Sequence, residues 1–392
     1  METYLEVRQH HDLARDLLTA AGLPGADADA AADVVGYADR HGYPTHGLKA
    51  LVNMYVPWLR GGRVDPAARP RLIARNGAVS VLDGADGLGV VVMTRATDLA
   101  ADTARRLGVG VVAVRRSSHF GAAGFYTHRL AHGGLAGIAM TNCGAQGVIP
   151  PLGGARRLLG TNPLSASVPA DDRPPFVLDM STTVVATGRV KAALQAGEDV
   201  PEGWLIGPDG SDVTDPAAYF RAEADVPWLG GRLATGGAKG YGLGLLVDLL
   251  CGPFAGAAFG PRRAALTETE PAADRDVGHL VIALSPAAFG DPDTILGETG
   301  ELLGTVSACP PAAYARDVTY PGAPEAARAA AAERKGIPLS PDVAEAVASL
   351  ARELGVPVPG ELCPAEGGAD GGEEREAVDG TAAGAADGTV RR

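Results

Sequence analysis

The hydrophobic pattern at the N-terminus predicts helices. Over residues 4–21 the leucines recur with the spacing of one buried helix face, and Gly22 and Pro24 end the pattern. Two more helices are expected at residues 26–40 and 47–59. The first seventy or so residues therefore predict a helical unit.

From Arg71 onward the apolar positions alternate, which is typical of β-strands. Further along, a helix is expected at residues 92–107, a strand at 109–114, a helix at 122–132 and a strand at 135–140. Strands interleaved with helices indicate an α/β body. Near the C-terminus, helices are expected near 324–335 and 341–354, bracketed by prolines.

Composition narrows the class of protein. With 392 residues, 46% of them hydrophobic and 5% aromatic, the chain can build two or three domains around a large core. The net charge of −13 argues against a nucleic-acid surface. No apolar run reaches the length of a membrane span, and the N-terminus lacks the pattern of a signal peptide. We therefore expect a cytoplasmic protein without nucleic-acid or membrane partners.

Two further features bear on chemistry and order. The four cysteines are far apart without C-x-x-C spacing, so the sequence predicts neither a disulfide framework nor a zinc site. His128 and His132 lack the carboxylate of an H-E-x-x-H site, so no metal centre is expected. Residues 361–392 contain eight acidic residues, three arginines and few large apolar side chains, which predicts a disordered acidic tail.

His119 is the main catalytic candidate. It follows a predicted strand and precedes a predicted helix, within the stretch 117–126. A side chain at such a junction can face a crevice while rigid elements hold its backbone. Imidazole also exchanges protons near neutral pH. The alternative is a buried histidine that is satisfied by a backbone carbonyl.

A second candidate segment lies between the second and third predicted helices. Pro44 biases Tyr43 away from helix, so Thr45 or His46 is expected at the N-cap of the third helix. Free backbone N–H groups there favour an anionic ligand. A plain helix cap is the alternative for Thr45.

The middle of the chain contains several loops whose residues could bind a ligand. Residues 160–163, Gly-Thr-Asn-Pro, have turn chemistry. Residues 179–182 are expected to begin a helix through about Leu194, with hydroxyl groups suited to phosphate or ribose. Lys239 lies among the glycines of residues 236–244, before a helix expected at 245–250, and is either a pyrophosphate ligand or a solvated lysine. The glycines of residues 84–89 lack the dinucleotide-binding spacing and predict a turn, and no Walker loop is present.

Taken in order, these motifs resemble the malate/L-lactate dehydrogenase type 2 family. That family includes malate, sulfolactate and ureidoglycolate dehydrogenases, diketogulonate reductase, and piperideine- and pyrroline-2-carboxylate reductases. The resemblance runs from about residue 5 to 358 and leaves out the acidic tail. The matching segments are Thr45-His46-Gly47, 118–124, Thr141-Asn142, 160–163, 178–181, Gly203-Trp204 with 214–216, and 239–242.

The resemblance implies an α/β fold with a non-Rossmann, mixed-sheet NAD(P)-binding domain and a helical domain built from both termini. It divides the chain into residues 1–70 plus 308–360 for the helical domain, 71–307 for the cofactor- and substrate-binding domain, and 361–392 for the tail. It also implies a homodimer.

The resemblance further implies roles for individual residues. His119 is expected to be the proton donor or acceptor. Thr45 and His46 are expected to contribute to both catalysis and substrate binding, and Lys49 and Thr161 to substrate binding alone. The cofactor, NAD or NADP, is expected to contact Cys143, Asn162, Asp179, Met180, Ser181, Lys239 and Gly240. The protein would orient the cofactor, which supplies the hydride.

One departure from the family bears on the substrate. The family usually has an arginine four residues after the histidine that His46 matches, where a guanidinium suits a substrate carboxylate. Here that position is Ala50, and the adjacent Lys49 is rotated by about 100° along a helix. Thr45 replaces serine, and Cys143 stands where a hydroxyl residue is common.

Three functions remain open. The first is an NAD(P)-dependent oxidoreductase acting on a 2-oxo or 2-hydroxy acid or an analogue. The second is an imine reductase acting on a cyclic or secondary-metabolite C=N bond, and Ala50 favours such a bulkier or uncharged substrate. The third is a cofactor-binding protein without catalytic activity. The sequence does not distinguish NAD from NADP.

Overall fold

The computed structural model describes residues 3–261, 266 and 276–362. Its centre is a seven-stranded mixed sheet with the order β2-β3-β4-β10-β5-β6-β7. Only β3 and β4 pair in parallel; the other neighbours are antiparallel. The strands are β2 (Arg71–Asn76), β3 (Val79–Asp83), β4 (Val109–Ser117), β5 (Ala136–Thr141), β6 (Leu164–Val168), β7 (Phe176–Met180) and β10 (Val277–Leu284). The predicted mixed α/β fold is confirmed.

Helices cover both faces of this sheet. Val112 and Val114 of β4 belong to the large core with α5 (Gly89–Leu107) and α6 (Ala123–His132), whereas Ala113 belongs to a smaller core with α9 (Gly237–Cys251). Alternate side chains of a strand point to opposite faces, so β4 is buried on both. This explains why β4 appears in the sequence as a continuous apolar run.

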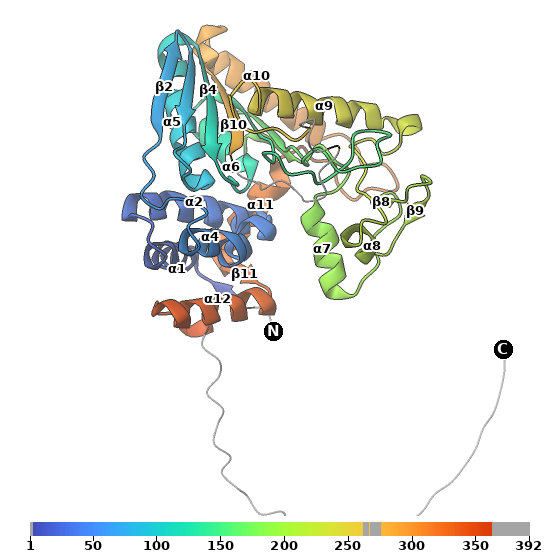
Figure 1. The fold of residues 1–392 in the computed structure, drawn as a ribbon. Coiled ribbons are helices and arrows are strands. Elements are labelled where there is room, and N and C mark those ends of the chain that lie inside the picture. Colours follow the sequence, from blue (N-terminus) through green and yellow to red (C-terminus); the bar gives the residue numbers. More distant parts are fainter. Residues whose placement is uncertain (1–2, 262–265, 267–275, 363–392) are drawn as a thin grey trace, which may run out of the picture.

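The N-terminal helices pack with the C-terminal ones. The elements are α1 (Val7–Ala20), α2 (Gly25–His41), α11 (Ala323–Lys335) and α12 (Pro341–Leu354), close to the predicted ranges. Strand β1 (Thr3–Leu5) pairs with β11 (Ile337–Leu339) in an antiparallel ladder. Figure 1 shows α1, α2 and α12 stacked below the sheet, with the N-terminus beside α12.

The third predicted helix is interrupted. It consists of α3 (Leu48–Ala50), a π-helical turn η2 (Leu51–Tyr55) and α4 (Val56–Arg60). Pro57 has no N–H group, and in a regular helix its ring would crowd the carbonyl of residue 53. A wider turn before Pro57 relieves this crowding, and π turns of this kind are frequent at functional sites.

Three predicted helix starts were wrong. Helix α5 begins at Gly89 rather than at residue 92. Asp179 and Met180 do not start a helix but pair with Ser165 and Leu164 in the sheet, and α7 begins only at Thr187 and runs to Ala196. Helix α9 begins at Gly237, so the glycines that predicted a loop form its first turns. Pairing within the sheet and close packing of glycines decide these limits, and neither is local in sequence.

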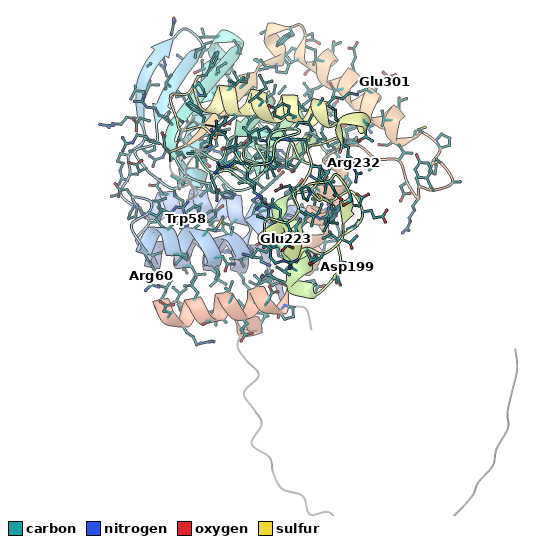
Figure 2. The ribbon with its side chains drawn as sticks, turned by 45° about the vertical axis from the view of Figure 1, so that its right-hand side comes forward. Trp58, Arg60, Asp199, Glu223, Arg232 and Glu301 are labelled. Atoms are coloured by element: carbon teal, nitrogen blue, oxygen red, sulfur yellow. The ribbon has the colours of Figure 1, made fainter. Side chains whose placement is uncertain are left out.

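A loop-rich lobe projects beside the sheet. It has its own small core, which includes Ile149, Val190 and Trp228. Its elements are α7, β8 (Leu205–Ile206), β9 (Asp212–Val213) and α8 (Ala217–Phe220). Figure 1 shows the lobe to the right of the terminal helices, and Figure 2 labels Trp58 on the helical side and Glu223 on the lobe.

The remaining helix, α10 (Pro292–Ser307), lies near α9 at the upper side of the molecule in Figure 1. Among the described residues, no helix has the length and apolar character needed to cross a membrane. The acidic tail predicted for 361–392 lies outside the described residues except for residues 361 and 362. Leu362 ends the short 3-10 helix Gly360–Leu362 and is buried in the large core.

Candidate functional site

A cavity of about 740 Å³ lies where the terminal helices, the ends of the central strands and the lobe meet. Its wall combines segments that are distant in sequence. They are residues 42–46, 119–123, 141–143 with 146, 161 with 163, 179–181, Ala186 with Arg189 and Ala192 of α7, Val277 and Arg328. The fold therefore brings Thr45, His46, His119, Cys143, Thr161, Asp179, Met180 and Ser181 to one cavity.

The backbone before His119 is held in place by the start of α5. The Gly89 N–H donates a hydrogen bond of 2.8 Å to the Ser118 hydroxyl. A Cβ atom on Gly89 would overlap the backbone oxygens of Ser118 and His119. Gly89 is thus required for close packing of α5 against this backbone. The turn predicted for residues 84–89 gave Gly89 no such role.

The ring of His119 is oriented by two neighbours at Nδ1. The Tyr55 hydroxyl lies 3.2 Å from Nδ1, and the Gly121 N–H donates to the same atom at 3.3 Å. Since a backbone N–H can only donate, Nδ1 is the acceptor and the neutral ring carries its proton on Nε2. Tyr55 was not identified from the sequence, because the π turn that directs it has no clear local signal besides Pro57.

The surroundings of His119 favour the neutral ring. Burial lowers its pKa to about 3, and the positive charges that His46, His279 and Arg63 can carry act in the same direction. The pKa of His46 is lowered to about 4 by burial, against the opposing effect of the Asp39 carboxylate. Both imidazoles are therefore neutral near pH 7 in the absence of a bound anion.

His46 stacks on His119 with ring centres 5.6 Å apart and an angle of 2° between the planes. The Thr45 hydroxyl lies 3.2 Å from Nδ1 of His46. The predicted N-cap role of Thr45 or His46 was wrong, because residues 44–46 form a 3-10 turn and Gly47 precedes α3.

Asp39, at the end of α2, caps α3 in their place. Its carboxylate accepts the Leu48 N–H at 2.8 Å and lies 2.8 Å from Nε2 of the buried His10. A side chain at position 47 would overlap this carboxylate. The Thr-His-Gly motif thus needs its glycine for a contact between helices, which no local sequence pattern predicts.

Asp179 is the acidic group of the cavity. Its carboxylate accepts the Gly124 N–H, at the start of α6, at 2.7 Å. Burial raises the pKa of Asp179 to about 6, although this hydrogen bond acts in the opposite direction. Burial likewise raises the pKa of the Cys143 thiol. Both residues are partly exposed at the cavity wall.

Four predicted site residues lie elsewhere. Asn162 has φ +38° and donates from its side chain to the Gly244 carbonyl at 2.8 Å, which ties the 160–163 turn to α9. Lys239 is exposed in the first turn of α9, and the next residue, Gly240, donates its N–H to Leu229. Lys49 donates to Gln195 at 3.1 Å and pairs with Asp342. None of the four lines this cavity within the described chain.

Ala50 is 2% exposed, so the position at which a carboxylate-binding arginine was expected is neutral and buried. Two other arginines line the cavity. Arg328 donates to Glu325 at 2.9 Å, and the Arg189 guanidinium lies 4.7 Å above the centre of the Trp204 ring. Neither arginine belongs to a motif that is recognisable in the sequence.

The chain is similar to proteins of known activity. The sequence profile of the malate/L-lactate dehydrogenase family matches residues 5–348. The malate dehydrogenase of Pyrococcus abyssi is 34% identical over 290 residues, which cover 74% of this chain and 78% of that protein. Other relatives are named as dehydrogenases of sulfolactate, lactate and ureidoglycolate, one specified for NADP(+) and one for NAD(+).

Solved structures of related enzymes have a similar fold. Malate dehydrogenase from Entamoeba histolytica has a TM-score of 0.85 at 26% identity, covering 92% of this chain and 100% of that chain. Delta1-piperideine-2-carboxylate reductase from Pseudomonas syringae pvar. tomato has a TM-score of 0.75 at 25% identity, covering 88% and 99%. Sequence profile, relatives and fold together show that this chain belongs to the malate/L-lactate dehydrogenase family.

Proposed function

We propose that this chain is an NAD(P)-dependent oxidoreductase that interconverts the C=O and CH–OH groups of a 2-oxo or 2-hydroxy acid or a close analogue, with His119 as proton donor and acceptor. The observation that carries this proposal is the fixed orientation of His119. Tyr55 and Gly121 engage Nδ1, which leaves Nε2 as the nitrogen available to a bound molecule.

The chemistry requires such a group. Reduction of a carbonyl develops negative charge on its oxygen, so a proton donor must lie beside that oxygen. His119 with its proton on Nε2 can donate a hydrogen bond to the carbonyl. The negative charge of a bound carboxylate would raise the pKa of His119, because it stabilises the imidazolium ion. The stacked His46 would then be a hydrogen-bonding neighbour for the same substrate.

Bound NAD(P)H would supply the hydride. The cavity contains suitable groups to hold it. Asp179 is half-buried and its carboxyl group can accept from hydroxyl or amide groups, Ser181 offers a hydroxyl, and Met180 and Cys143 offer apolar contact. We propose that these residues hold the cofactor. Contacts from Lys239, Gly240 and Asn162 remain predictions.

The cofactor site is proposed to be unlike a Rossmann site. A dinucleotide-binding fold places the pyrophosphate at the helix start of a βαβ unit. In the β3-α5-β4 unit that position is filled by the protein itself, since Ser118 accepts the Gly89 N–H. We also propose that the terminal helices act as one discontinuous domain, supported by the β1–β11 pairing.

We further propose a cytoplasmic homodimer. Apolar side chains are exposed on α9 and α10 and next to them, and a subunit interface would cover such a surface. They are Leu246 (49% exposed), Leu249 (47%), Phe254 (78%), Leu302 (63%) and Val306 (43%). Sedimentation velocity would test this, since a monomeric mass at micromolar concentration contradicts it.

A titration with NADH and NADPH tests the function without a guess at the substrate. We expect saturable quenching of tryptophan emission by at least one cofactor, weakened in Asp179→Asn and, if Lys239 contributes, in Lys239→Ala. Oxaloacetate, pyruvate and sulfopyruvate would then be screened at 340 nm. Absence of binding by either cofactor would contradict the enzyme function and favour a protein without catalytic activity.

A reductase of cyclic imines is the second candidate. It is supported by the neutral Ala50 and by the structural similarity to the piperideine-2-carboxylate reductase. The same screen distinguishes the two, because faster turnover of piperideine-2-carboxylate than of every 2-oxo acid would favour imine reduction.

A further inference from the structure

Helix α7 is fastened to the segment that carries His46. At its start, a Cβ atom on Gly188 would lie 3.3 Å from the Thr45 methyl carbon, so only glycine allows this approach without a shift. At its end, the Gln195 side chain accepts a hydrogen bond from Lys49 at 3.1 Å. The helix therefore lies along the Thr45–Lys49 segment.

One side of α7 faces the cavity. Arg189 and Ala192, three residues apart on the helix, line it together with Ala186, the residue just before the helix. The two alanines leave space around Arg189, which is the only large side chain of the three. The neighbouring Lys191 does not line the cavity.

Arg189 differs from the other arginine of this cavity. Arg328 donates to the Glu325 carboxylate. In contrast, the guanidinium of Arg189 makes no hydrogen bond or ion pair within the described part of the chain and rests over the Trp204 ring. Stacking on an aromatic face orients a guanidinium and leaves its N–H edge free to donate. A free, oriented guanidinium in a ligand cavity suits a planar oxyanion.

We propose that Arg189, held by Trp204, binds the carboxylate of the substrate. This rests on the proposed function and deepens it, because it identifies an anionic substrate despite the buried, neutral Ala50. In this arrangement the carboxylate lies beside α7, and the reacting carbon lies between it and His119. The tryptophan of the Gly203-Trp204 motif thereby acts as a positioning residue for Arg189.

A phosphate of the cofactor presents the same oxyanion chemistry, so the experiment separates the two sources. Arg189→Ala and Arg189→Lys are compared with Lys191→Ala, which removes one positive charge from the same helix outside the cavity. Each variant is titrated with NADH, NADPH and oxalate, and the kcat and KM for oxaloacetate or the best 2-oxo acid are measured. Circular dichroism and thermal melting verify the fold.

We expect Arg189→Ala to lower kcat/KM for the 2-oxo acid by roughly 10- to 100-fold, mainly through KM, as for a lost hydrogen bond to a charged group. Oxalate binding should weaken in parallel, while the cofactor dissociation constants change less than about twofold. Arg189→Lys should recover part of the loss, and Lys191→Ala should resemble the wild type. Trp204→Leu should raise KM with little change in kcat.

Two outcomes would overturn the proposal. If Arg189→Ala weakens NADH or NADPH binding and leaves oxalate binding unchanged, the oxyanion is a cofactor phosphate. If neither changes, Arg189 binds no anion here. Failure of the proposed function is separate, because it would appear in the wild type as absence of cofactor binding, whereas oxalate binding tests Arg189 even then.

Discussion

The two walls of the cavity are built in different ways. The His119 wall belongs to the large core, with Tyr55 and Phe120 almost fully buried beside the ring and the start of α5 packed against its backbone. The α7 wall belongs to the small core of the lobe, and Val190 is the only residue of α7 that is fully buried. One wall is anchored in the centre of the molecule, and the other is an exposed helix held at few points.

This difference fits a division of tasks. Proton transfer needs a group held within a fraction of an ångström, which requires dense support on every side. Recognition of a particular acid needs a surface that can change without damage to the core, which loops and lobes provide. The neutral position at Ala50, inside the rigid wall, and the free guanidinium of Arg189, on the adjustable wall, agree with this division.

The largest expected effect comes from the ring of His119 itself. His119→Gln should lower kcat about 10²- to 10⁴-fold, as expected for loss of a positioned acid–base group, and should change the dissociation constant of the cofactor less than about threefold. His132→Gln, which changes an exposed histidine of α6, is the control. A His119→Gln enzyme with nearly wild-type kcat would show that the rigid wall does not carry the proton transfer.

Support of the backbone should have an intermediate effect. Gly89→Ala forces the start of α5 away from Ser118 and His119 and should lower the free energy of unfolding by about 1–3 kcal/mol, as overpacked cores do. Gly297→Ala in α10 is the matched control, because nothing lies within 4 Å of its added Cβ. There alanine should stabilise the helix by up to about 1 kcal/mol. Urea unfolding measures both, and equal values would contradict the packing argument.

Acid should destabilise the fold through the buried histidines His41 and His128, and the contribution of each ring should be smaller than the effects above. Burial lowers the pKa of His128 to about 3 and that of His41 to about 4. An unfolded chain takes up these protons near pH 6.5, so between about pH 6.5 and 4 the unfolded state binds more protons. The free energy of unfolding therefore falls as the pH falls through this window, and is fully present above it.

Replacing one of these two histidines tests whether its burial causes the loss of stability in acid. His128→Gln should reduce the slope of unfolding free energy against pH in this window by up to about 1.4 kcal/mol per pH unit. His11→Gln, on the surface of α1, should leave the slope nearly unchanged. Melting curves between pH 4.5 and 8 would decide, and identical slopes for His128→Gln and wild type would rule out His128 as a source of acid sensitivity.

The sequence by itself determined the elements with strong local signals. The terminal helices and β4 follow from periodicity and end signals, because the burial of one face or of both leaves a pattern that can be read along the chain. Ordered motifs also identified the family and the residues Thr45, His46, His119 and Asp179, which the structure brings to one cavity.

Only the tertiary structure decided the rest. Met180 ends a strand because β6 lies beside it, Asp39 caps a helix that begins nine residues later, and Tyr55 reaches His119 through a π turn. The role proposed for Arg189 depends on the packing of α7 against Thr45. Such contacts join residues that are distant in sequence, and their energies depend on packing and burial, which leave no periodic pattern for the sequence to display.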